Sequence, residues 1–503
     1  MNAQVRRLFF VLVGLFVALI VMTTYWLWKA PDLEARQGNP QLIVQQLTID
    51  RGSILASDGR TPFARNQKVR KKQLGSTWYL RTYPTGELAA RPVGYSTIER
   101  SRTGLEESMN DYLTGSNANL DTLLNNTLDK LRGITQRGND VITTIDAKAQ
   151  QTAQDALAGH CGGAVALDPK TGKVLVWASQ PTYDPNLVEG HFNQIQRDAA
   201  GAPCTPAAPL LDRISQGLFI PGSTFKVVTA TAALESGKVT PSTTFNDPGY
   251  CIEYGKKVLN FADQSGPEVF GTVTFAEALE NSINAVFCEV GKQFGARAII
   301  DQAKKFGFYE KPPIELPSDE ISVSGLYQNG HLYDPKDPNA VDPGRLAFGQ
   351  ERLQVTPLQM ALVAAAVAND GTIMQPTLVD RIVDPDGKVI QRSEPDTWKE
   401  PMTPQTAAEL TAMMTAVVQG GTGVAAQIPG IQVAGKTGTA ETPGNKACGG
   451  GVEENQAWFI GFAPADDPKI AIAATVECTE QFGNDVAAPI FRDVAEAILA
   501  GEE

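Results

Sequence analysis

The stretch FIPGSTFKVVTATAALESG, residues 219–237, combines a helix start with two side chains suited to nucleophilic catalysis. Proline and glycine at positions 221–222 break the chain, helix-forming residues follow, and Gly237 stands where a C-terminal glycine cap is expected. We therefore expect Ser223 to open a helix, with Lys226 on the same face three residues later. The lysine amine could take the hydroxyl proton, while the helix N-terminus favours the developing negative charge.

The serine–lysine pair needs support from its surroundings and from the rest of the sequence. A lysine with an ordinary pKa near 10.4 is a poor base at neutral pH, and lowering that pKa by about 3 units through desolvation costs about 4 kcal/mol. The SxxK pattern by itself is also weak, because about one match is expected by chance in a chain of this length.

A second motif follows in EALENSINAVF, residues 277–287. Its apolar spacing predicts an amphipathic helix, with Ser282 and Asn284 at the start or in the middle of it. A hydroxyl and an amide beside the nucleophile could pass a proton to a leaving amine and hold a substrate amide. Capping of the helix by Ser282 is the alternative interpretation.

A third motif consists of Lys436, Thr437 and Gly438, followed by Thr439, on a predicted strand. Gly438 would allow a ligand to approach the backbone closely. The same three letters at 170–172 occupy a predicted hairpin turn ahead of the serine, so we assign them no chemistry. The three motifs in this order, in one chain, reduce the odds of chance coincidence to about a few per cent and form a known signature of penicillin-interactive serine enzymes.

The strand and helix patterns predict an α+β fold in which helices flank an antiparallel sheet. Two apolar runs surround the turn at 169–172, and three more strands follow near the C-terminus. Short connections between the last strands require antiparallel pairing, because parallel neighbours need a long crossover. The strands are expected at 163–168, 173–179, 430–440, 457–463 and 469–477, and the helices at 223–236, 275–294, 357–369 and 490–499.

The N-terminal region predicts a membrane anchor. Residues 8–28 contain no charged side chain, a length that spans a bilayer as a helix and exceeds the apolar core of a cleaved signal. Arg6 and Arg7 precede it, so the positive-inside rule makes residues 1–7 a cytoplasmic tail and places the rest of the chain outside the cytoplasmic membrane. We expect a polar pedestal at 31–140 and a catalytic domain at 141–500.

Composition excludes several other classes of function. The formal charge of −13 over 503 residues gives no general attraction to polyanions, so nucleic-acid binding is disfavoured. The chain has only three histidines and no paired Cys/His spacing, so neither a metal site, nor any other cofactor, nor a Ser-His-Asp triad is expected. Its six cysteines would lie in an oxidising compartment and could form up to three disulfides.

Longer stretches of the chain resemble class B penicillin-binding proteins, and most of all their actinobacterial PbpA type. IDRGSILASDGR at 49–60 is similar to the membrane-proximal motif of this family, and RTGLEESMNDYLTG at 102–115 to its pedestal motif. Two further stretches, 163–186 and 347–371, are similar to parts of its transpeptidase domain. The resemblance implies a serine β-lactamase/DD-peptidase-like transpeptidase domain on an elongated N-terminal pedestal with one transmembrane helix.

The resemblance also implies a role for each candidate residue in cross-linking cell-wall peptides. Ser223 would be the acylated nucleophile and Lys226 its base, while Ser282 would relay a proton to the departing D-alanine. Backbone amides of Ser223 and Thr439 would form the oxyanion hole. Asn284 would hold the peptide amide of the substrate.

The remaining residues of the third motif would recognise the end of the substrate. The resemblance implies that Lys436, Thr437 and Thr439 bind the terminal carboxylate of stem peptides ending in D-Ala-D-Ala, and that β-lactams acylate the serine. A membrane glycosyltransferase of the shape, elongation, division and sporulation class would supply the glycan strands. The sequence departs from the family in SIN at 282–284 in place of SDN and in GQE at 349–351 in place of GQG.

One disulfide can be suggested from the predicted topology. If three antiparallel strands begin at the third motif, the loop containing Cys448 and the end of the last strand at Cys478 lie at the same edge of the sheet, where a bridge can form.

Other functions stay open at this point. A D,D-carboxypeptidase or a β-lactamase-like hydrolase would use the same residues and let water attack the acyl-enzyme. A glutamate followed four residues later by asparagine, as in class A hydrolysis, does not occur between Asn284 and Lys436. A catalytically silent cell-wall scaffold would keep the fold without the nucleophile, which the intact set of motif residues argues against.

Overall fold

The computed structural model describes residues 3–34, 47–70, 77–116, 137–263, 266–337, 340–441, 448 and 455–501. Helix α1 (Ala3–Glu34) contains the segment Phe9–Trp26, which has a mean hydropathy of 2.3 and makes no buried contacts. Within the described residues it is the one helix long and apolar enough to cross a membrane. The first two residues of the expected cytoplasmic tail lie outside the described part of the chain.

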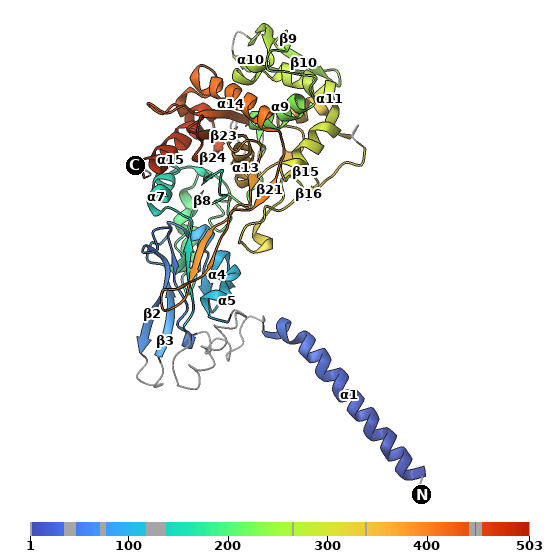
Figure 1. Cartoon of the computed structure of the whole chain (residues 1–503), viewed down its shortest axis with the longest axis vertical. Helices are drawn as coiled ribbons and strands as arrows, with labels where there is room; N and C mark the ends of the chain where they lie inside the picture. The colour runs from blue at the N-terminus through green and yellow to red at the C-terminus, as the bar shows by residue number, and fades with distance from the viewer. Residues whose placement is uncertain are drawn as a thin grey trace.

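The lower body in Figure 1 is built on a six-stranded sheet that draws on distant parts of the sequence. Its two central strands, β1 and β6, pair in parallel, and its other pairs are antiparallel. Two strands from beyond residue 370 complete the sheet on one side of β6. In spatial order the strands are β20 (Val389–Arg392), β19 (Val379–Val383), β6 (Asp140–Thr143), β1 (Ile54–Leu55), β2 (Pro62–Arg70) and β3 (Thr77–Thr82).

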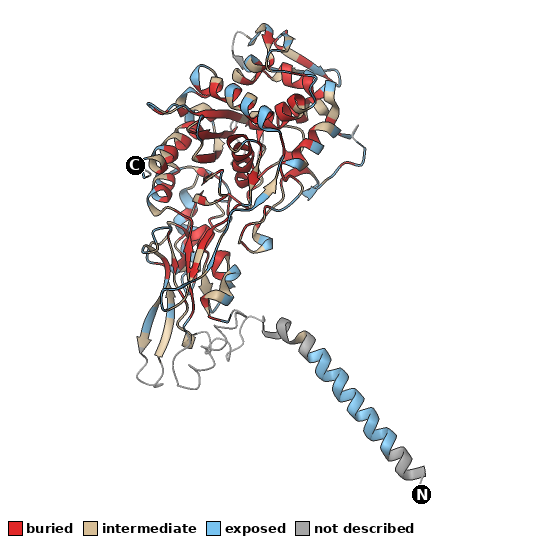
Figure 2. Ribbon diagram, viewed as in Figure 1, coloured by how far each residue is buried: buried red, intermediate tan, exposed pale blue. Residues whose placement is uncertain are grey.

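The upper body contains the central five-stranded sheet, which is antiparallel throughout as the short connections predict. The third motif lies on its edge strand. Figure 2 shows that this sheet is almost entirely buried. In spatial order the strands are β22 (Ala434–Glu441), β23 (Asn455–Ala463), β24 (Ile470–Thr479), β7 (Cys161–Leu167) and β8 (Val174–Gln180).

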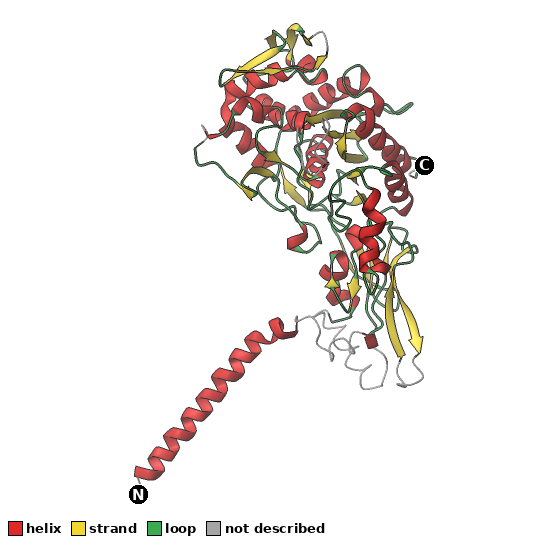
Figure 3. Ribbon diagram, turned by 180° about the vertical axis from the view of Figure 1, so that it is seen from behind, coloured by secondary structure: helices red, strands yellow, loops and turns green. Residues whose placement is uncertain are grey.

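Helices cover both faces of the central sheet because side chains alternate along each strand. Val165 and Trp177 point into the core formed with α13 (Pro357–Ala368), whose residues are all buried. Ala164 and Val176 point to the opposite face, which α7 (Ala147–Ala156) and α15 (Ala488–Leu499) cover (Figure 3). The same core also contains α14 (Pro404–Gln419), which packs on β22, and, farther from the sheet, α9 (Lys226–Glu235) and α11 (Asn284–Lys305), which pack on each other.

The prediction of a single helix at 275–294 is wrong in one respect, because the structure has two helices there, α10 (Phe275–Glu280) and α11. Between them Ser282 has a φ of +57°, a left-handed conformation that an α-helix cannot contain. The amide of Ile283 donates to the carbonyl of Ala278 and stabilises this turn. The break aims the residues of the second motif at the first one.

Short elements complete the described fold. The small sheets pair β4 (Ser96–Thr97) with β5 (Ser101–Arg102), β9 (Thr244–Asp247) with β14 (Gly271–Thr274), β10 (Tyr250–Glu253) with β11 (Lys256–Leu259), β12 (Ala262–Asp263) with β13 (Gly266–Pro267), β15 (Gly325–Gln328) with β16 (His331–Leu332) and β17 (Leu353–Gln354), and β18 (Ile373–Met374) with β21 (Thr397–Lys399). The short helices are α3 (Ala90–Val93), α4 (Gly104–Ser108), α5 (Asn110–Leu113), α8 (Phe192–Asp198) and α12 (Pro343–Ala347).

A buried carboxylate forms ion pairs that link three segments of the lower body. Glu106, on α4, is fully buried and accepts hydrogen bonds from the guanidinium groups of Arg51, at 2.8 Å, and Arg81. Burial alone would raise the pKa of Glu106, but the two guanidinium groups outweigh it and hold that pKa below its ordinary value. Three segments that are separate in sequence therefore meet at one ionised group.

We expect Glu106→Gln to lower the free energy of unfolding by about 3–5 kcal/mol, because it leaves two buried guanidinium groups without a counter-charge. Denaturant unfolding would measure the change. Glu107→Gln is the matched control, since Glu107 is exposed, and should cost less than about 0.5 kcal/mol. Equal stabilities of the two variants would contradict this role for Glu106.

Candidate active site

The structure brings the three sequence motifs together where α9, the α10–α11 turn and strand β22 meet. Ser223 lies in the 3-10 turn Gly222–Phe225 that leads into α9, and Lys226 is the first residue of that helix. Gly222 has a φ of +51°, and a Cβ atom added there would lie 2.8 Å from the carbonyl oxygen of Thr439. The backbone of the serine turn therefore contacts the backbone of β22 directly.

Glycine is required on the strand side of this contact as well. A Cβ atom on Gly438 would lie 2.8 Å from the carbonyl oxygen of Pro221 and 2.8 Å from the methyl carbon of Thr224. Any side chain at position 438 would push the strand away from the turn that carries Ser223.

Lys226 is fully buried, and its amine contacts both polar residues of the second motif. Its Nζ donates to the carbonyl oxygen of Ser282 at 2.6 Å and to Oδ1 of Asn284 at 2.7 Å, and lies 3.2 Å from Oγ of Ser282. Burial, and then the nearby charge of Lys436, lower the pKa of Lys226 well below its ordinary value. A neutral amine has two hydrogens, which these two acceptors take, so its lone pair is left to accept a proton.

The amine of Lys436 approaches the same serine hydroxyl from the other side. Its Nζ lies 2.9 Å from Oγ of Ser282 and donates to the carbonyl oxygen of Thr437 at 3.0 Å. Burial lowers the pKa of Lys436 to about 7. The hydroxyl of Ser282 thus bridges two buried amines, an arrangement suited to moving a proton between them and a third group.

Asn284 keeps one donor for a ligand. Its Nδ2 donates to the carbonyl oxygen of Leu259 at 3.1 Å, and an amide nitrogen carries two hydrogens. The neighbouring Asn260 accepts a hydrogen bond from the backbone amide of Ala285 at 2.9 Å. These bonds fix the start of α11 against the end of β11.

One residue at this site was not predicted from the sequence. Oγ1 of Thr422 lies 2.7 Å from Oγ1 of Thr437. Thr422 belongs to the glycine-rich segment GGTG at 420–423, between α14 and the 3-10 turn Val424–Ala426. That glycine content was the only signal in the sequence, and it does not indicate what the loop contacts.

The GQE loop packs beneath the serine turn. The backbone amide of Gly222 donates to the carbonyl of Gly349 at 3.1 Å, and a Cβ atom on Gly349 would lie 1.9 Å from the carbonyl oxygen of Gly222. Glu351 has a φ of +63° and forms an ion pair with Arg352. The conformation at position 351 is one that favours glycine, which agrees with the GQG pattern from which this chain departs.

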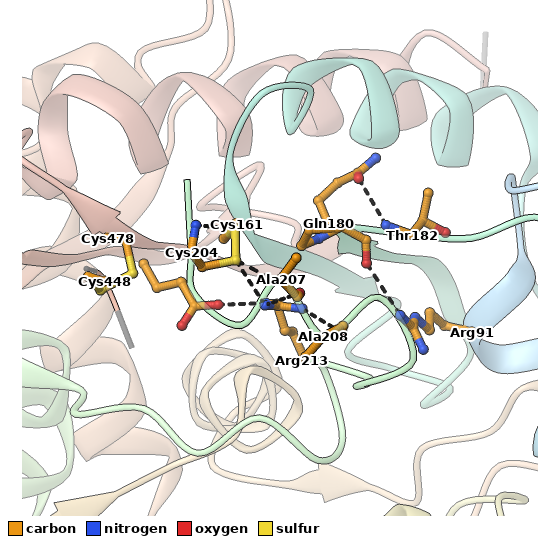
Figure 4. The surroundings of a disulfide bond; sticks show 12 residues. Arg91, Cys161, Gln180, Thr182, Cys204, Ala207, Ala208, Arg213, Cys448 and Cys478 are labelled. Carbon is orange, nitrogen blue, oxygen red and sulfur yellow. Dashed lines mark hydrogen bonds and ion pairs between the residues drawn. A yellow bond between two sulfur atoms is a disulfide. The ribbon is translucent and has the colours of Figure 1, made fainter. Parts of the chain in front are cut away.

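Three disulfides join the six cysteines, Cys161 to Cys204, Cys251 to Cys288, and Cys448 to Cys478. The last is the pair suggested from the sequence, and the other two were not predicted. Figure 4 shows two of them close together, beside Arg213, which donates to Ala207 and contacts the sulfur of Cys204. Because these sulfurs are bonded to one another, the cysteine and carboxylate clusters among the described residues offer no thiolate to a metal ion.

The second KTG sequence, at 170–172, was predicted to lie in a hairpin turn and to have no catalytic role. It lies in the turn between β7 and β8. Lys170 is exposed there, and its amine forms an ion pair with the carboxylate of Asp467 at 2.6 Å. Such an exposed pair contributes little to stability.

Comparisons with known proteins identify the family of the domain that contains this site. The chain matches the penicillin binding protein transpeptidase domain over residues 162–496 and the penicillin binding protein A dimerisation domain over residues 51–141. It is 34% identical over 515 residues to peptidoglycan D,D-transpeptidase PbpA of Mycolicibacterium smegmatis, covering 99% of each chain. It is also 34% identical over 530 residues to PbpA of Mycobacterium tuberculosis, covering 100% of each chain.

A solved structure extends the agreement to the fold. Penicillin-binding protein A from M. tuberculosis, in a ceftriaxone acyl-enzyme complex, has a TM-score of 0.79 and 32% sequence identity to this chain, covering 91% of this chain and 100% of that one. The transpeptidase match covers more than half of the chain, and the relatives match along nearly its whole length. The chain therefore belongs to the penicillin-binding protein transpeptidase family.

Proposed function

We propose that this chain is a peptidoglycan D,D-transpeptidase that works through an acyl-enzyme on Ser223. The observation that carries the proposal is the fully buried amine of Lys226, whose pKa burial lowers well below its ordinary value, three residues after a serine whose turn contacts the KTG strand. A relative solved as a penicillin G acyl-enzyme complex, 32% identical and with a TM-score of 0.76, supports covalent inhibition by β-lactams.

Acylation begins when Lys226 accepts the proton of the Ser223 hydroxyl. Oγ of Ser223 then attacks the carbonyl carbon between the two terminal D-alanines of a stem peptide. The backbone amides of Ser223 and Thr439 hold the resulting oxyanion, and one such donor typically contributes about 3 kcal/mol to the transition state. The close backbone contact between the serine turn and β22 supports this pair of donors.

The Ser282 hydroxyl carries the proton to the departing D-alanine amine. Its position between the amines of Lys226 and Lys436 supports this role, because it can donate to the leaving group while it accepts from a lysine. The free donor of Asn284 holds the carbonyl of the peptide bond beside the reacting one.

The carboxylate of the terminal D-alanine binds to Lys436, Thr437 and Thr439. Gly438, between the two threonines, makes room for the serine turn and not for the substrate, because a Cβ atom there would meet Pro221 and Thr224. The amine of a second stem peptide then attacks the acyl-enzyme and forms the cross-link. Attack by water in its place would make the enzyme a carboxypeptidase or a β-lactamase.

The length and apolar composition of α1 support a membrane location for the enzyme. In this proposal residues 8–28 anchor the chain as a single pass, residues 1–7 stay in the cytoplasm, and residues 31–140 form a pedestal for the transpeptidase domain at 141–500. Residues 8–28 contain no charged side chain, which supports a membrane anchor. The two arginines before this segment support the orientation. A membrane glycosyltransferase of the shape, elongation, division and sporulation class supplies the glycan strands.

Fluorescent penicillin should label the wild-type protein and not the Ser223→Ala variant, because the covalent bond forms to Oγ of that serine. Ser236→Ala, at the other end of α9, is the matched control and should label like the wild type, since the Ser236 hydroxyl donates to the carbonyl of Ala233 and accepts from the amide of Lys238, both at that helix end. Labelling of a correctly folded Ser223→Ala variant would refute the assignment. Rapid turnover of nitrocefin by the wild type would favour a hydrolase.

Acylation by penicillin G should remain fast at neutral pH and slow down in acid. The pKa of Lys226 is lowered by burial and by Lys436, so its basic form persists to lower pH than that of an ordinary lysine and is lost as the pH falls through that lowered pKa. The second-order rate constant, measured across this range, reports the transition. A transition near the pKa of an ordinary lysine, about 10.4, would contradict this role.

The variant Lys436→Gln sharpens the same experiment. The charge of Lys436 lowers the pKa of Lys226, so its removal should shift the acid transition of the acylation rate to higher pH, whatever happens to the maximal rate. An unshifted transition would mean that another group controls the pH dependence.

Protein extracted from membranes with detergent should retain its N-terminal residues, because α1 is long enough to serve as an anchor. Intact-mass spectrometry distinguishes a retained anchor from a cleaved signal. Protein found in the soluble fraction and beginning after residue 28 would show that the apolar segment is removed.

A further inference from the structure

We infer that Thr422 is a positioning residue of the carboxylate site, where its hydroxyl orients the hydroxyl of Thr437. The inference rests on the proposed function, in which Thr437 binds the terminal carboxylate of the substrate. Neither the motifs nor the family comparisons assign a role to the loop that contains Thr422.

The Thr422 loop is fixed against the wall of the site that carries Ser282. The backbone amide of Thr422 donates to the carbonyl of Glu280 at 3.3 Å, and Glu280 is the last residue of α10, two positions before Ser282. A Cβ atom on Gly421 would lie 2.5 Å from that same carbonyl oxygen. The backbone of the loop can therefore move little. Thr422 links the segment before the second motif, through its backbone amide, to the third motif, through its hydroxyl.

The two hydroxyls are hydrogen-bonded, and either of them can be the donor when no ligand is bound. The two Oγ1 atoms lie 2.7 Å apart, the usual separation for a bond between hydroxyls. Thr437 has a single hydroxyl hydrogen, so when it donates to a bound carboxylate it must accept, and not donate, in its bond with Thr422. Thr422 is placed to donate to that oxygen, and the amine of Lys436 is 3.5 Å from it.

The resulting chain runs from Thr422 to Thr437 to the substrate carboxylate. Each bond in such a chain polarises the next, so the second hydroxyl becomes a stronger donor. Without the Thr422 hydroxyl, Thr437 could rotate its hydrogen toward other acceptors, because a hydroxyl hydrogen turns to suit its surroundings. The charge of Lys436 would remain, so binding would be weakened and not abolished.

The test compares Thr422→Val, which removes the hydroxyl at nearly constant volume, with Thr422→Ser, which keeps it. We expect the second-order rate constant for acylation by penicillin G to fall about three- to tenfold in the valine variant, as for loss of one hydrogen bond, and to recover in the serine variant. Thr415→Val is the matched control, because the Thr415 hydroxyl bonds to the carbonyl of Thr411 inside α14.

Penicillin G methyl ester separates orientation of the carboxylate site from a general structural effect. It lacks the charged carboxylate, so its slower acylation should be nearly the same in wild type and Thr422→Val. A wild-type rate with penicillin G in Thr422→Val would overturn the inference. So would an equal loss with acid and ester that Thr422→Ser fails to restore. Failure of the proposed function would look different, because the wild-type protein itself would then not be acylated.

Discussion

Two lysine amines buried on either side of one serine hydroxyl impose the main constraint on this structure. Removing an ammonium group from water costs several kcal/mol, so Lys226 and Lys436 release protons more readily than exposed lysines do. The hydroxyl of Ser282 and the carbonyl and amide oxygens around it satisfy the amines that water no longer reaches. Reactivity and the cost of burial thus arise from the same arrangement.

Close backbone contacts maintain that arrangement. Gly222, Gly349 and Gly438 lie where a single methyl group would collide with a neighbouring main chain. They allow the serine turn, the GQE loop and the KTG strand to meet without intervening side chains. The bond between Cys251 and Cys288 secures the remaining wall, because it ties β10 to the first turns of α11. The spacing of the reactive groups therefore depends on atoms that take no part in the reaction.

The sequence was sufficient for those features that depend on local patterns. The helix after Ser223, the order of the last three strands and the turn that holds Lys170 all follow from periodicity and short connections. The turn at Ser282 was hidden, since helix-forming residues surround it and its left-handed backbone is stabilised by tertiary contacts. Thr422 and two of the disulfides depend on pairings between distant segments, which no local pattern records.

One sheet combines strands before residue 144 with strands after residue 378, and this affects how the protein is made. Ile142 pairs with Arg381, so β6 keeps an open edge until β19 has been synthesised and has reached it. Contacts between such distant residues form slowly, and unpaired strand edges promote aggregation. During biogenesis the sheet of the lower body cannot be completed until most of the catalytic domain has been synthesised. A nascent chain released before that point would expose the unpaired edge of β6, which is prone to aggregation.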